Sequence, residues 1–269
     1  MKISLKENIW KQVYQFVKMR KRENGGFGAT PYLPPTIEDT YYALEILKAL
    51  EKFDPSINSK LLIDQRLKLW SRKNVVNIIK YAIHSYKMIY YLIKIIQNLQ
   101  DDKSLYFLKN RCKELFCSFS QKNHELEKVF YILKSLRSLD LEEIELNFNL
   151  TWGLENIKEA YQLVWLWKNY QVDRSFPIQE VLKWLKEDFN PDGGYGFYPG
   201  TTSYLENTFY ALKIYSLLEI KPENLNQTKE FIISCYVGKG GFARKPGATA
   251  FLESTYYAVK SFEVLLSIG

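Results

Sequence analysis

Two kinds of helical pattern alternate along the chain. In the first kind, apolar residues recur at i, i+3, i+4 and i+7 on one face, as over residues 9–17 and 178–185. In the second kind, as over residues 41–47, apolar residues surround the helix nearly completely. A one-sided pattern is typical of a surface helix, and an all-round pattern is typical of a buried one. The alternation therefore predicts pairs that combine one amphipathic helix with one buried helix.

One sequence occurs three times with the same internal spacing. The copies begin at Gly25, Gly193 and Gly240 and share G-G-[FY], ten further residues, and then E-[DNS]-T-[FY]-Y-A-[LV]. In each copy the first glycine precedes the threonine by 15 residues. We interpret the glycines as helix terminators with positive φ and the run after the threonine as a buried helix. Spacing without gaps in three copies indicates an internal structural repeat.

The middle of the chain carries weaker versions of the repeat. "AIHSYKMIYYL", "ELEKVFYILKSL" and "LENIKEAYQLVWLW" lie near the expected intervals, which gives about six units. We therefore predict a single all-α domain over residues 1–269, an α/α toroid of six helix pairs with an inner and an outer ring. The inner ring should include helices over residues 36–52, 203–220 and 250–267.

The net charge indicates the kind of partner, and the cysteines indicate the cellular compartment. The 269 residues carry a formal net charge of +7, which favours anionic partners. The charge is spread along the chain, so a nucleic acid is not the expected partner. Three cysteines without a CxxC motif are expected of a reducing cytoplasm. We expect no signal peptide and no transmembrane segment, because no uncharged apolar run reaches the length of a membrane span.

The repeat resembles that of protein prenyltransferase β subunits and of squalene and terpene cyclases. "GGFARKPGATAFLESTYYAV" is most similar to the last repeat of the β subunits, including Lys245-Pro246-Gly247. The similarity is good over residues 25–50 and 190–267 and rests on helix count over 55–175. The resemblance implies a toroid around an apolar cavity, an isoprenoid diphosphate or other apolar ligand, and a helical-repeat protein as partner.

The zinc site of the prenyltransferases does not carry over to this sequence. Its Asp, Cys and His ligands align with Tyr204, Glu206 and Ser254, of which only Glu206 is a suitable ligand type. The two histidines, His84 and His124, lie elsewhere in the chain. The sequence therefore predicts no zinc and no bound cofactor, and it leaves Mg²⁺ open.

The acidic pair Glu38-Asp39 has two interpretations. The stretch from Thr36 to Thr40 matches the D-x-D-D-T acid motif of class II terpene cyclases, with its first Asp replaced by Thr and its middle Asp by Glu. Asp39 and Glu38 are therefore the candidate catalytic residues. Neighbouring positions on a helix point apart, so the two cannot form a dyad through their own helix.

The other copies favour a structural role for the same acids. Glu206 and Glu253 occupy the position of Glu38, and an acid in a first turn complements the helix dipole. Ser203 and Glu206 have the spacing of a capping box. The position of Asp39 is Asn207 in the second copy and a serine in the third, so Asp39 stays the stronger candidate for chemistry.

Aromatic residues and one basic loop supply the candidate ligand contacts. The chain has 16 Phe, 20 Tyr and 6 Trp, many of them in the buried helices, where they suit an isoprenoid chain or simple packing. Arg244 and Lys245 stand where a diphosphate would find a basic rim, although a surface loop charge explains them as well. The full set of candidate substrate-binding residues is Tyr42, Tyr204, Glu206, Tyr210, Arg244, Lys245 and Tyr257.

A lysine recurs every seven residues at positions 73, 80, 87 and 94. On an outer helix these lysines would form a solvated stripe. On an inner helix over residues 74–98 they would face a cavity and could hold an anion.

Three functions fit the sequence. The first is an isoprenoid-handling enzyme without zinc, a relative of prenyl transferases or terpene cyclases. The second is a lipid-binding toroid without chemistry, and the third is a protein-interaction toroid.

Overall fold

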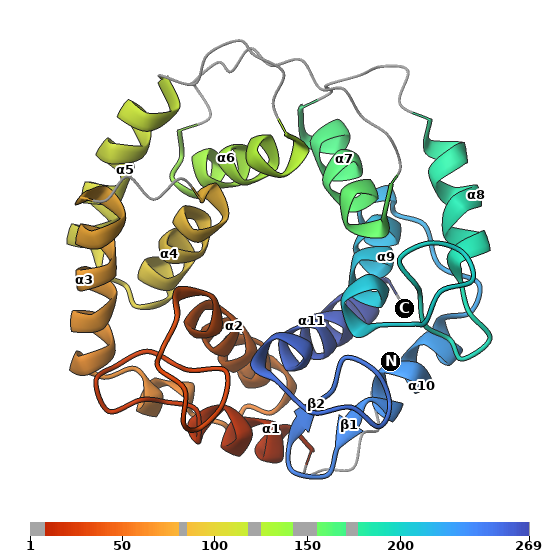
Figure 1. Ribbon diagram of the computed structural model, residues 1–269, viewed down its shortest axis with the longest axis horizontal. Helices are drawn as coiled ribbons and strands as arrows, with labels where there is room; N and C mark the ends of the chain where they lie inside the picture. The colour runs from red at the N-terminus through yellow and green to blue at the C-terminus, as the bar shows by residue number, and fades with distance from the viewer. Residues whose placement is uncertain (1–8, 81–84, 118–124, 142–154, 171–176, 269) are drawn as a thin grey trace. The chain divides into compact units, whose positions relative to one another are not determined.

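The computed structural model describes residues 9–80, 85–117, 125–141, 155–170 and 177–268. These residues form eleven α-helices, one short 3₁₀-helix and one two-stranded antiparallel hairpin (Figure 1). The elements are α1 (Ile9–Lys18), α2 (Ile37–Phe53), η1 (Ser59–Leu62), α3 (Gln65–Lys80), α4 (Tyr86–Asn98), α5 (Asp102–Cys117), α6 (Leu126–Ser138), α7 (Ile157–Tyr170), α8 (Ile178–Asp188), α9 (Leu205–Leu218), α10 (Leu225–Ser234), β1 (Tyr236–Val237), β2 (Gly241–Phe242) and α11 (Leu252–Ile268). The predicted all-α class is confirmed, and the three predicted inner helices match α2, α9 and α11 to within two residues at each end.

The chain divides into two compact units, which we describe separately. Unit 1 comprises Met1–Val17, Ile46–Ile57 and Gly153–Gly269, and unit 2 comprises Lys18–Glu45 and Asn58–Trp152. Helix α2 contributes its first half to unit 2 and its second half to unit 1. No helix within the described residues is long and apolar enough to cross a membrane.

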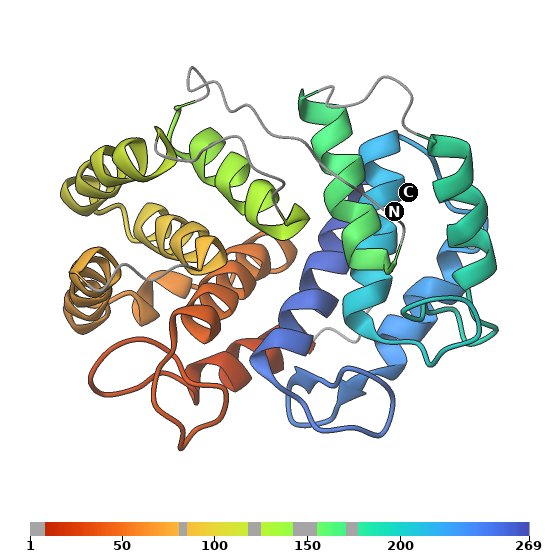
Figure 2. The same cartoon turned by 45° about the horizontal axis from the view of Figure 1, so that its top comes forward.

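Unit 1 has two layers of helices. Helices α7, α9 and α11 pack side by side, and α8 and α10 cover one side of this layer (Figures 1 and 2). Nearly every residue from Leu205 to Leu212 and from Leu252 to Val259 is buried, which explains the all-round apolar pattern. Helix α1 buries one stripe only. Its buried residues are Ile9, Trp10, Val13, Phe16 and Val17, the set that the helical spacing predicts.

Unit 2 repeats the arrangement with more divergent sequence. Helix α4 packs against α6 on one side and against α3 and α5 on the other. The lysines at seven-residue spacing do not lie on one helix, because α3 ends at Lys80 and α4 begins at Tyr86. Lys73 is exposed on α3, whereas Lys87 and Lys94 are half-buried on α4. The prediction of one lysine face on one helix was therefore wrong, and His84 lies outside the described residues.

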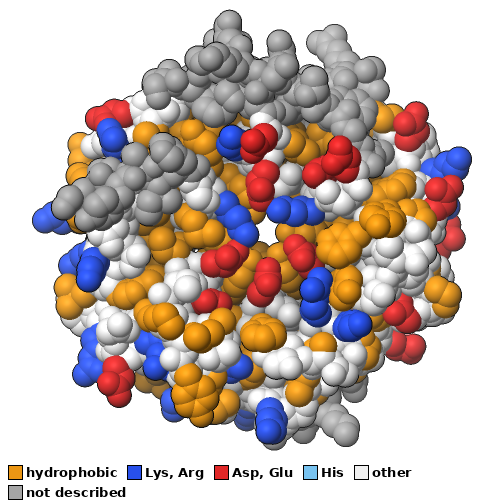
Figure 3. All heavy atoms as spheres, in the orientation of Figure 1, with side chains coloured by type: hydrophobic (Ala, Val, Ile, Leu, Met, Phe, Trp, Pro, Cys, Tyr) orange, Lys and Arg blue, Asp and Glu red, His pale blue; other side chains and the backbone are white. Residues whose placement is uncertain are grey.

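Charged side chains of both signs are scattered over the visible surface. Figure 3 shows Lys and Arg side chains interspersed with Asp and Glu side chains and with hydrophobic groups. On this face the net charge of +7 is thus distributed, as the sequence suggested.

The three copies of the repeat form the same turn, which one threonine holds. In the first copy, the backbone N–H of Phe27 donates to Oγ1 of Thr40 at 3.0 Å. The same bond joins Tyr195 to Thr208 at 3.2 Å and Phe242 to Thr255 at 3.0 Å. All three bonds are buried, so each threonine satisfies an amide that would otherwise lose its hydrogen bond to water. The threonine of the sequence pattern therefore joins the turn to the buried helix.

The first glycine of each copy allows the turn to approach a neighbouring helix. Gly25, Gly193 and Gly240 have φ of 92°, 90° and 99°, which L side chains rarely adopt. A Cβ at these positions would overlap the backbone carbonyl oxygen of Arg66 on α3, of Gln227 on α10 and of Gln12 on α1, respectively. The last copy thus packs on the first helix of the chain.

We expect Thr208→Val to destabilise the protein by about 1–3 kcal/mol, because valine keeps the volume but leaves the buried N–H of Tyr195 unsatisfied. Urea unfolding at neutral pH measures this loss. Thr202→Val, at an exposed position in the same loop, is the matched control and should change the free energy of unfolding by less than about 0.5 kcal/mol. Equal effects of the two substitutions would contradict the role given to Thr208.

Candidate functional site

Glu38 of α2 points toward α4 in unit 2. Its Oε1 lies 2.6 Å from Nζ of Lys87 and accepts a hydrogen bond from the Tyr42 hydroxyl at 3.1 Å. The Lys87 ammonium also lies 5.4 Å from the centre of the Tyr91 ring. Glu38 is therefore charge-balanced by a helix 49 residues further along the chain. It belongs to the first turn of α2, as the helix-start interpretation requires, but its side chain bonds across the unit.

Asp39 supports the start of α2. The Thr36 hydroxyl donates to Oδ2 of Asp39 at 2.6 Å, and Oγ1 of Thr36 accepts from the Asp39 N–H at 3.0 Å. Burial raises the pKa of Asp39, while the hydrogen bond from Thr36 opposes the rise and the Arg20 guanidinium opposes it more weakly. A raised pKa makes Asp39 a weaker acid than usual, which is the opposite of what protonation of an alkene requires.

Tyrosines from three helices form a cluster beside this pair in unit 2. The rings of Tyr41 and Tyr91 stack with centres 4.0 Å apart, and Tyr42 is only 1% exposed. Tyr42 therefore lies in the packed interior and reaches Glu38 with its hydroxyl.

A pocket of about 300 Å³ lies beside α4 and α6. It is lined by Ser85, Tyr86, Lys87, Glu125, Glu127, Lys128 and Tyr131.

Three of the predicted ligand-binding residues come together in unit 1. The hydroxyls of Tyr210 on α9 and Tyr257 on α11 lie 3.3 Å apart, and the Tyr257 hydroxyl donates to Oε1 of Glu206 at 3.4 Å. Tyr161 of α7 stacks on Tyr210 with ring centres 5.4 Å apart. Phe209 packs against Tyr257 at 5.5 Å. We call these five residues the tyrosine face.

The predicted capping box between Ser203 and Glu206 was wrong. The Ser203 hydroxyl donates to Oδ1 of Asp192 at 2.7 Å and accepts from Nδ2 of Asn190 at 2.9 Å. The N-cap residue of α9 is Tyr204, and its side chain makes no capping hydrogen bond. Ser203 therefore holds the turn, and Glu206 is free to point along the tyrosine face.

The basic loop of the last repeat lies over the start of α9. The Arg244 guanidinium is 3.9 Å from the centre of the Tyr204 ring, a cation–π contact. The backbone carbonyl of Arg244 accepts from the Leu205 N–H at 2.8 Å. Lys245 is exposed beside it. Tyr204 and Arg244 are thus brought together, as two members of the predicted set.

The residues at the aligned zinc positions do not fit a zinc site. Arg244 covers the Tyr204 ring, Glu206 accepts a hydrogen bond from Tyr257, and Ser254 is buried with 6% exposed. In the part of the chain that the structure describes, no group of three His, Cys, Asp or Glu residues could hold a metal ion. His84 and His124 lie outside that part.

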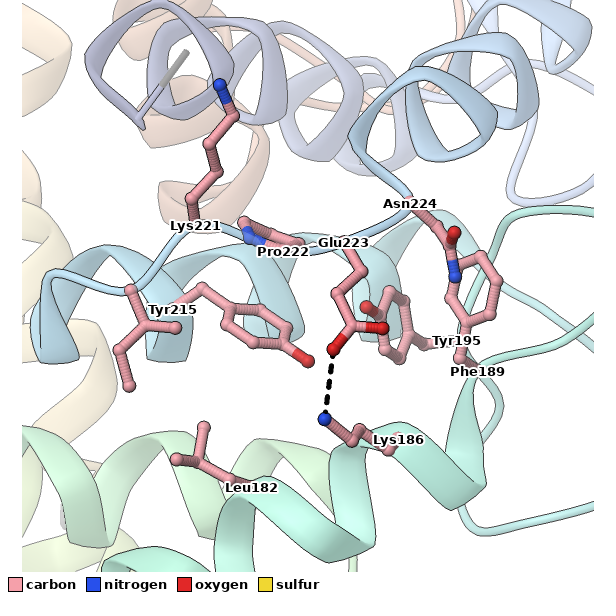
Figure 4. Close-up of a pocket in the computed structure, with 10 residues that line it drawn as sticks. Leu182, Lys186, Phe189, Tyr195, Tyr215, Lys221, Pro222, Glu223 and Asn224 are labelled. Atoms are coloured by element: carbon pink, nitrogen blue, oxygen red, sulfur yellow. Dashed lines mark hydrogen bonds and ion pairs between the residues drawn. The ribbon is translucent and has the colours of Figure 1, made fainter.

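A second pocket, which the sequence did not indicate, opens between α8, α9 and the segment before α10 in unit 1 (Figure 4). Its volume is about 300 Å³, and Lys186 and Glu223 form an ion pair of 3.0 Å across it. The hydroxyls of Tyr195 and Tyr215 hydrogen-bond each other. The other lining residues are Leu182, Phe189, Ile220, Lys221, Pro222 and Asn224. No candidate from the sequence lines this pocket.

The position five residues before the first glycine differs in chemistry among the three copies. It is Arg20 in the first copy, Asp188 in the second and Cys235 in the third, and all three are buried. Arg20 interacts with Asp39, which occupies the position of Asn207 in the second copy. Both carboxylate oxygens of Asp188 and Nδ2 of Asn207 are buried without a hydrogen bond to the described residues. Burial raises the pKa of Asp188 to about 7.

We expect Asp188 to make stability fall as the pH rises from about 4 to about 7. The unfolded carboxyl releases its proton near pH 4, whereas the folded one keeps it until its pKa of about 7. The loss is complete above pH 7 and amounts to at most about 4 kcal/mol. Asp188→Asn removes this slope, so urea unfolding should show the variant gaining stability over the parent chain between pH 4 and pH 8. The exposed neighbour provides the control Glu187→Gln, which should leave the slope unchanged. Parallel profiles for the parent chain and Asp188→Asn would contradict the assignment.

We expect the purified protein to carry no stoichiometric zinc, because Tyr204, Glu206 and Ser254 do not supply a ligand set. Elemental analysis after dialysis measures this directly. About one zinc per chain, lost in Glu206→Gln, would show that the alignment of the ligand positions is wrong.

Comparison with known proteins gives the family. The family model of the prenyltransferase alpha-alpha toroid domain matches residues 1–101 and 99–225. Among solved structures, the chain is similar to Candida albicans protein geranylgeranyltransferase-I complexed with GGPP, at 14% identity and a TM-score of 0.46 over 81% of this chain and 90% of that one. A search of curated proteins found no match. Because the family model covers most of the 269 residues, it confirms the resemblance and the predicted α/α toroid class. The chain belongs to the family of prenyltransferase alpha-alpha toroid domains.

Proposed function

We propose that this chain handles an isoprenoid diphosphate without zinc, as a relative of prenyl transferases or terpene cyclases. The observation that carries the proposal is the tyrosine face of unit 1. Tyr161, Tyr210 and Tyr257 come from three adjacent helices and are held by mutual contacts. Aromatic rings fixed in this way suit an apolar chain and stabilise a developing carbocation by cation–π attraction.

The proposal assigns the diphosphate to the basic loop of the last repeat. Arg244 is held over Tyr204, so its position is fixed by packing as well as by the backbone bond to Leu205. Lys245 adds a second positive charge at the same loop. A fixed guanidinium and a flexible ammonium are a suitable pair for phosphate oxygens. Mg²⁺ remains open as a further counter-ion.

The proposal favours transfer of a prenyl group over cyclisation started by an acid. Glu38 is neutralised by Lys87, and Asp39 is bonded to Thr36 with a raised pKa. Neither carboxyl is prepared to protonate an alkene. We therefore propose that the reaction begins with cleavage of the diphosphate and not with protonation by Asp39.

The second candidate is a toroid that binds a lipid, or a helical-repeat protein partner, without chemistry. The engagement of both Glu38 and Asp39 in structural contacts is the observation that favours it. A cytoplasmic location belongs to either proposal, because Cys112 and Cys235 are buried free thiols.

Calorimetry with farnesyl and geranylgeranyl diphosphates and with their alcohols tests the proposal. We expect saturable binding that weakens, and loses part of its salt dependence, when the diphosphate is removed, because salt screens exposed charges. The shorter chain should bind more weakly, by roughly 0.8 kcal/mol for each buried CH₂ that is lost.

Two tyrosine variants locate the site. Tyr257→Leu should weaken binding of both alcohols, because it removes a ring and its bond to Glu206. Tyr198→Leu, at a site that is 57% exposed, is the matched control and should bind like the parent chain. Absence of saturable binding to all four compounds would reject the isoprenoid proposal. Binding without turnover when Mg²⁺ is added would favour the second candidate.

A further inference from the structure

Two lysines stand at the same repeat position on adjacent helices of unit 1. Lys213 on α9 and Lys260 on α11 each follow the first glycine of their copy by 20 residues. The residues three positions earlier are Tyr210 and Tyr257, whose hydroxyls lie 3.3 Å apart. Residues three apart on a helix share one face. The two lysines therefore continue the tyrosine face by about one helical turn.

The Lys213 ammonium has no hydrogen bond or ion pair to the described residues. Its side chain is partly buried, and burial is the main cause that lowers its pKa. The charge of Lys260 lowers the pKa further, and the charge of Glu263 opposes both effects. A charge that is partly withdrawn from water without a counter-ion in direct contact costs free energy. A negatively charged ligand near Lys213 and Lys260 would offset this cost.

The carboxylate nearby is already engaged. Glu263 of α11 lies 2.7 Å from Nζ of Lys52 and also forms an ion pair with Lys260. Burial acts to raise the pKa of Glu263, but Lys260 and Lys52 outweigh it and the pKa is lowered. Glu263 is therefore ionised and shared. Lys52, Lys213 and Lys260 come from three helices, and all three ammonium groups interact with the Glu263 carboxylate. One negative charge is thus shared among three positive charges.

We propose that Lys52, Lys213 and Lys260 form a binding site for a compact polyanion of the phosphate type. Lysine ammonium groups are compact point charges that adapt to phosphate oxygens from several directions. The site is distinct from the basic loop, because Arg244 covers Tyr204 at the start of α9. Lys213 lies nine residues further along that helix, which is about 13 Å at 1.5 Å per residue.

The polyanion has two chemically equivalent sources. It is either a free anion such as pyrophosphate or the head group of a ligand whose chain lies on the tyrosine face. The inference does not rest on the proposed function, because pyrophosphate has no chain and tests the lysines alone.

Titration with inorganic pyrophosphate, followed by calorimetry and by the rise in melting temperature, tests the site. We expect saturable binding by the parent chain and at least about tenfold weaker binding by Lys213→Met. This variant should fold well, because it removes a buried charge, and its melting temperature without ligand should equal or exceed that of the parent chain. Lys183→Met on α8 is the matched control, because Lys183 is 78% exposed and lies outside the cluster. It should bind pyrophosphate like the parent chain.

Arg244→Ala separates this site from the basic loop. The proposed function assigns a diphosphate to Arg244, so this variant removes pyrophosphate bound at the basic loop. We expect it to retain one saturable pyrophosphate site, which Lys213→Met in the same background weakens by at least about tenfold. Farnesyl diphosphate and farnesol then identify the source. A loss of farnesyl diphosphate affinity in Lys213→Met, with farnesol unaffected, identifies a ligand head group and moves the diphosphate of the proposed function from Arg244 to these lysines. A loss for pyrophosphate alone identifies a free anion. The site is rejected if the parent chain does not bind pyrophosphate, if Lys213→Met binds it normally, or if Arg244→Ala abolishes binding.

Discussion

The hydrogen bond from a turn amide to a threonine hydroxyl is the interaction on which the repeat depends. It joins residues that lie 13 positions apart in each of three copies and is buried in all of them. Each turn connects an amphipathic helix to a buried one, so the bond fixes how the second helix leaves the first. Because the bond uses the backbone of the turn, the residue that donates can be Phe or Tyr. Its acceptor, by contrast, has to be a short side chain with a hydroxyl at one position. This explains why the pattern keeps the threonine while the residues of the loop vary.

The same turn leaves its polar neighbours free to differ. At the position that carries Arg20, the second copy has Asp188 and the third has Cys235, and the partner position changes from Asp39 to Asn207 and Ser254. A fold held by backbone contacts tolerates a positive, a negative and a neutral side chain at equivalent sites. This variation also costs folding free energy locally, because Asp188 and Asn207 keep buried polar atoms without hydrogen-bond partners among the described residues. The chemical character of these positions therefore differs from copy to copy, although the repeat keeps the same turn.

Sequence reasoning succeeded where the signal is local. The buried stripe of α1 and the bounds of α2, α9 and α11 follow from helical spacing, glycine and threonine positions within about 20 residues. It failed where a side chain binds a residue far away in the sequence, or where a different residue takes the expected hydrogen bond. Lys87 on another helix forms an ion pair with Glu38, and no local sequence pattern predicts that contact. Ser203 has capping spacing to Glu206, but Asn190 and Asp192 take its hydroxyl first. Lys213 and Lys260 follow the first glycine of their copies by the same 20 residues, but only the contact between Tyr210 and Tyr257 shows that the two lysines continue one face.

The packing of the last turn on the first helix has a consequence for how the chain folds. Trp10 contacts Phe262, and Gly240 and Gly241 of the last copy approach Gln12 and Phe16 of α1. A ribosome releases α1 more than 200 residues before these partners exist. Until then its apolar stripe has no native surface to cover it on that side, and contacts of such long sequence separation form slowly. Trp10 can stack on Phe53 of α2 early in synthesis, but Phe16 and the edge of Trp10 that contacts Phe262 wait for the last repeat. The interval between synthesis of α1 and of α11 is thus the period in which these groups leave the nascent chain most open to aggregation or to capture by a chaperone.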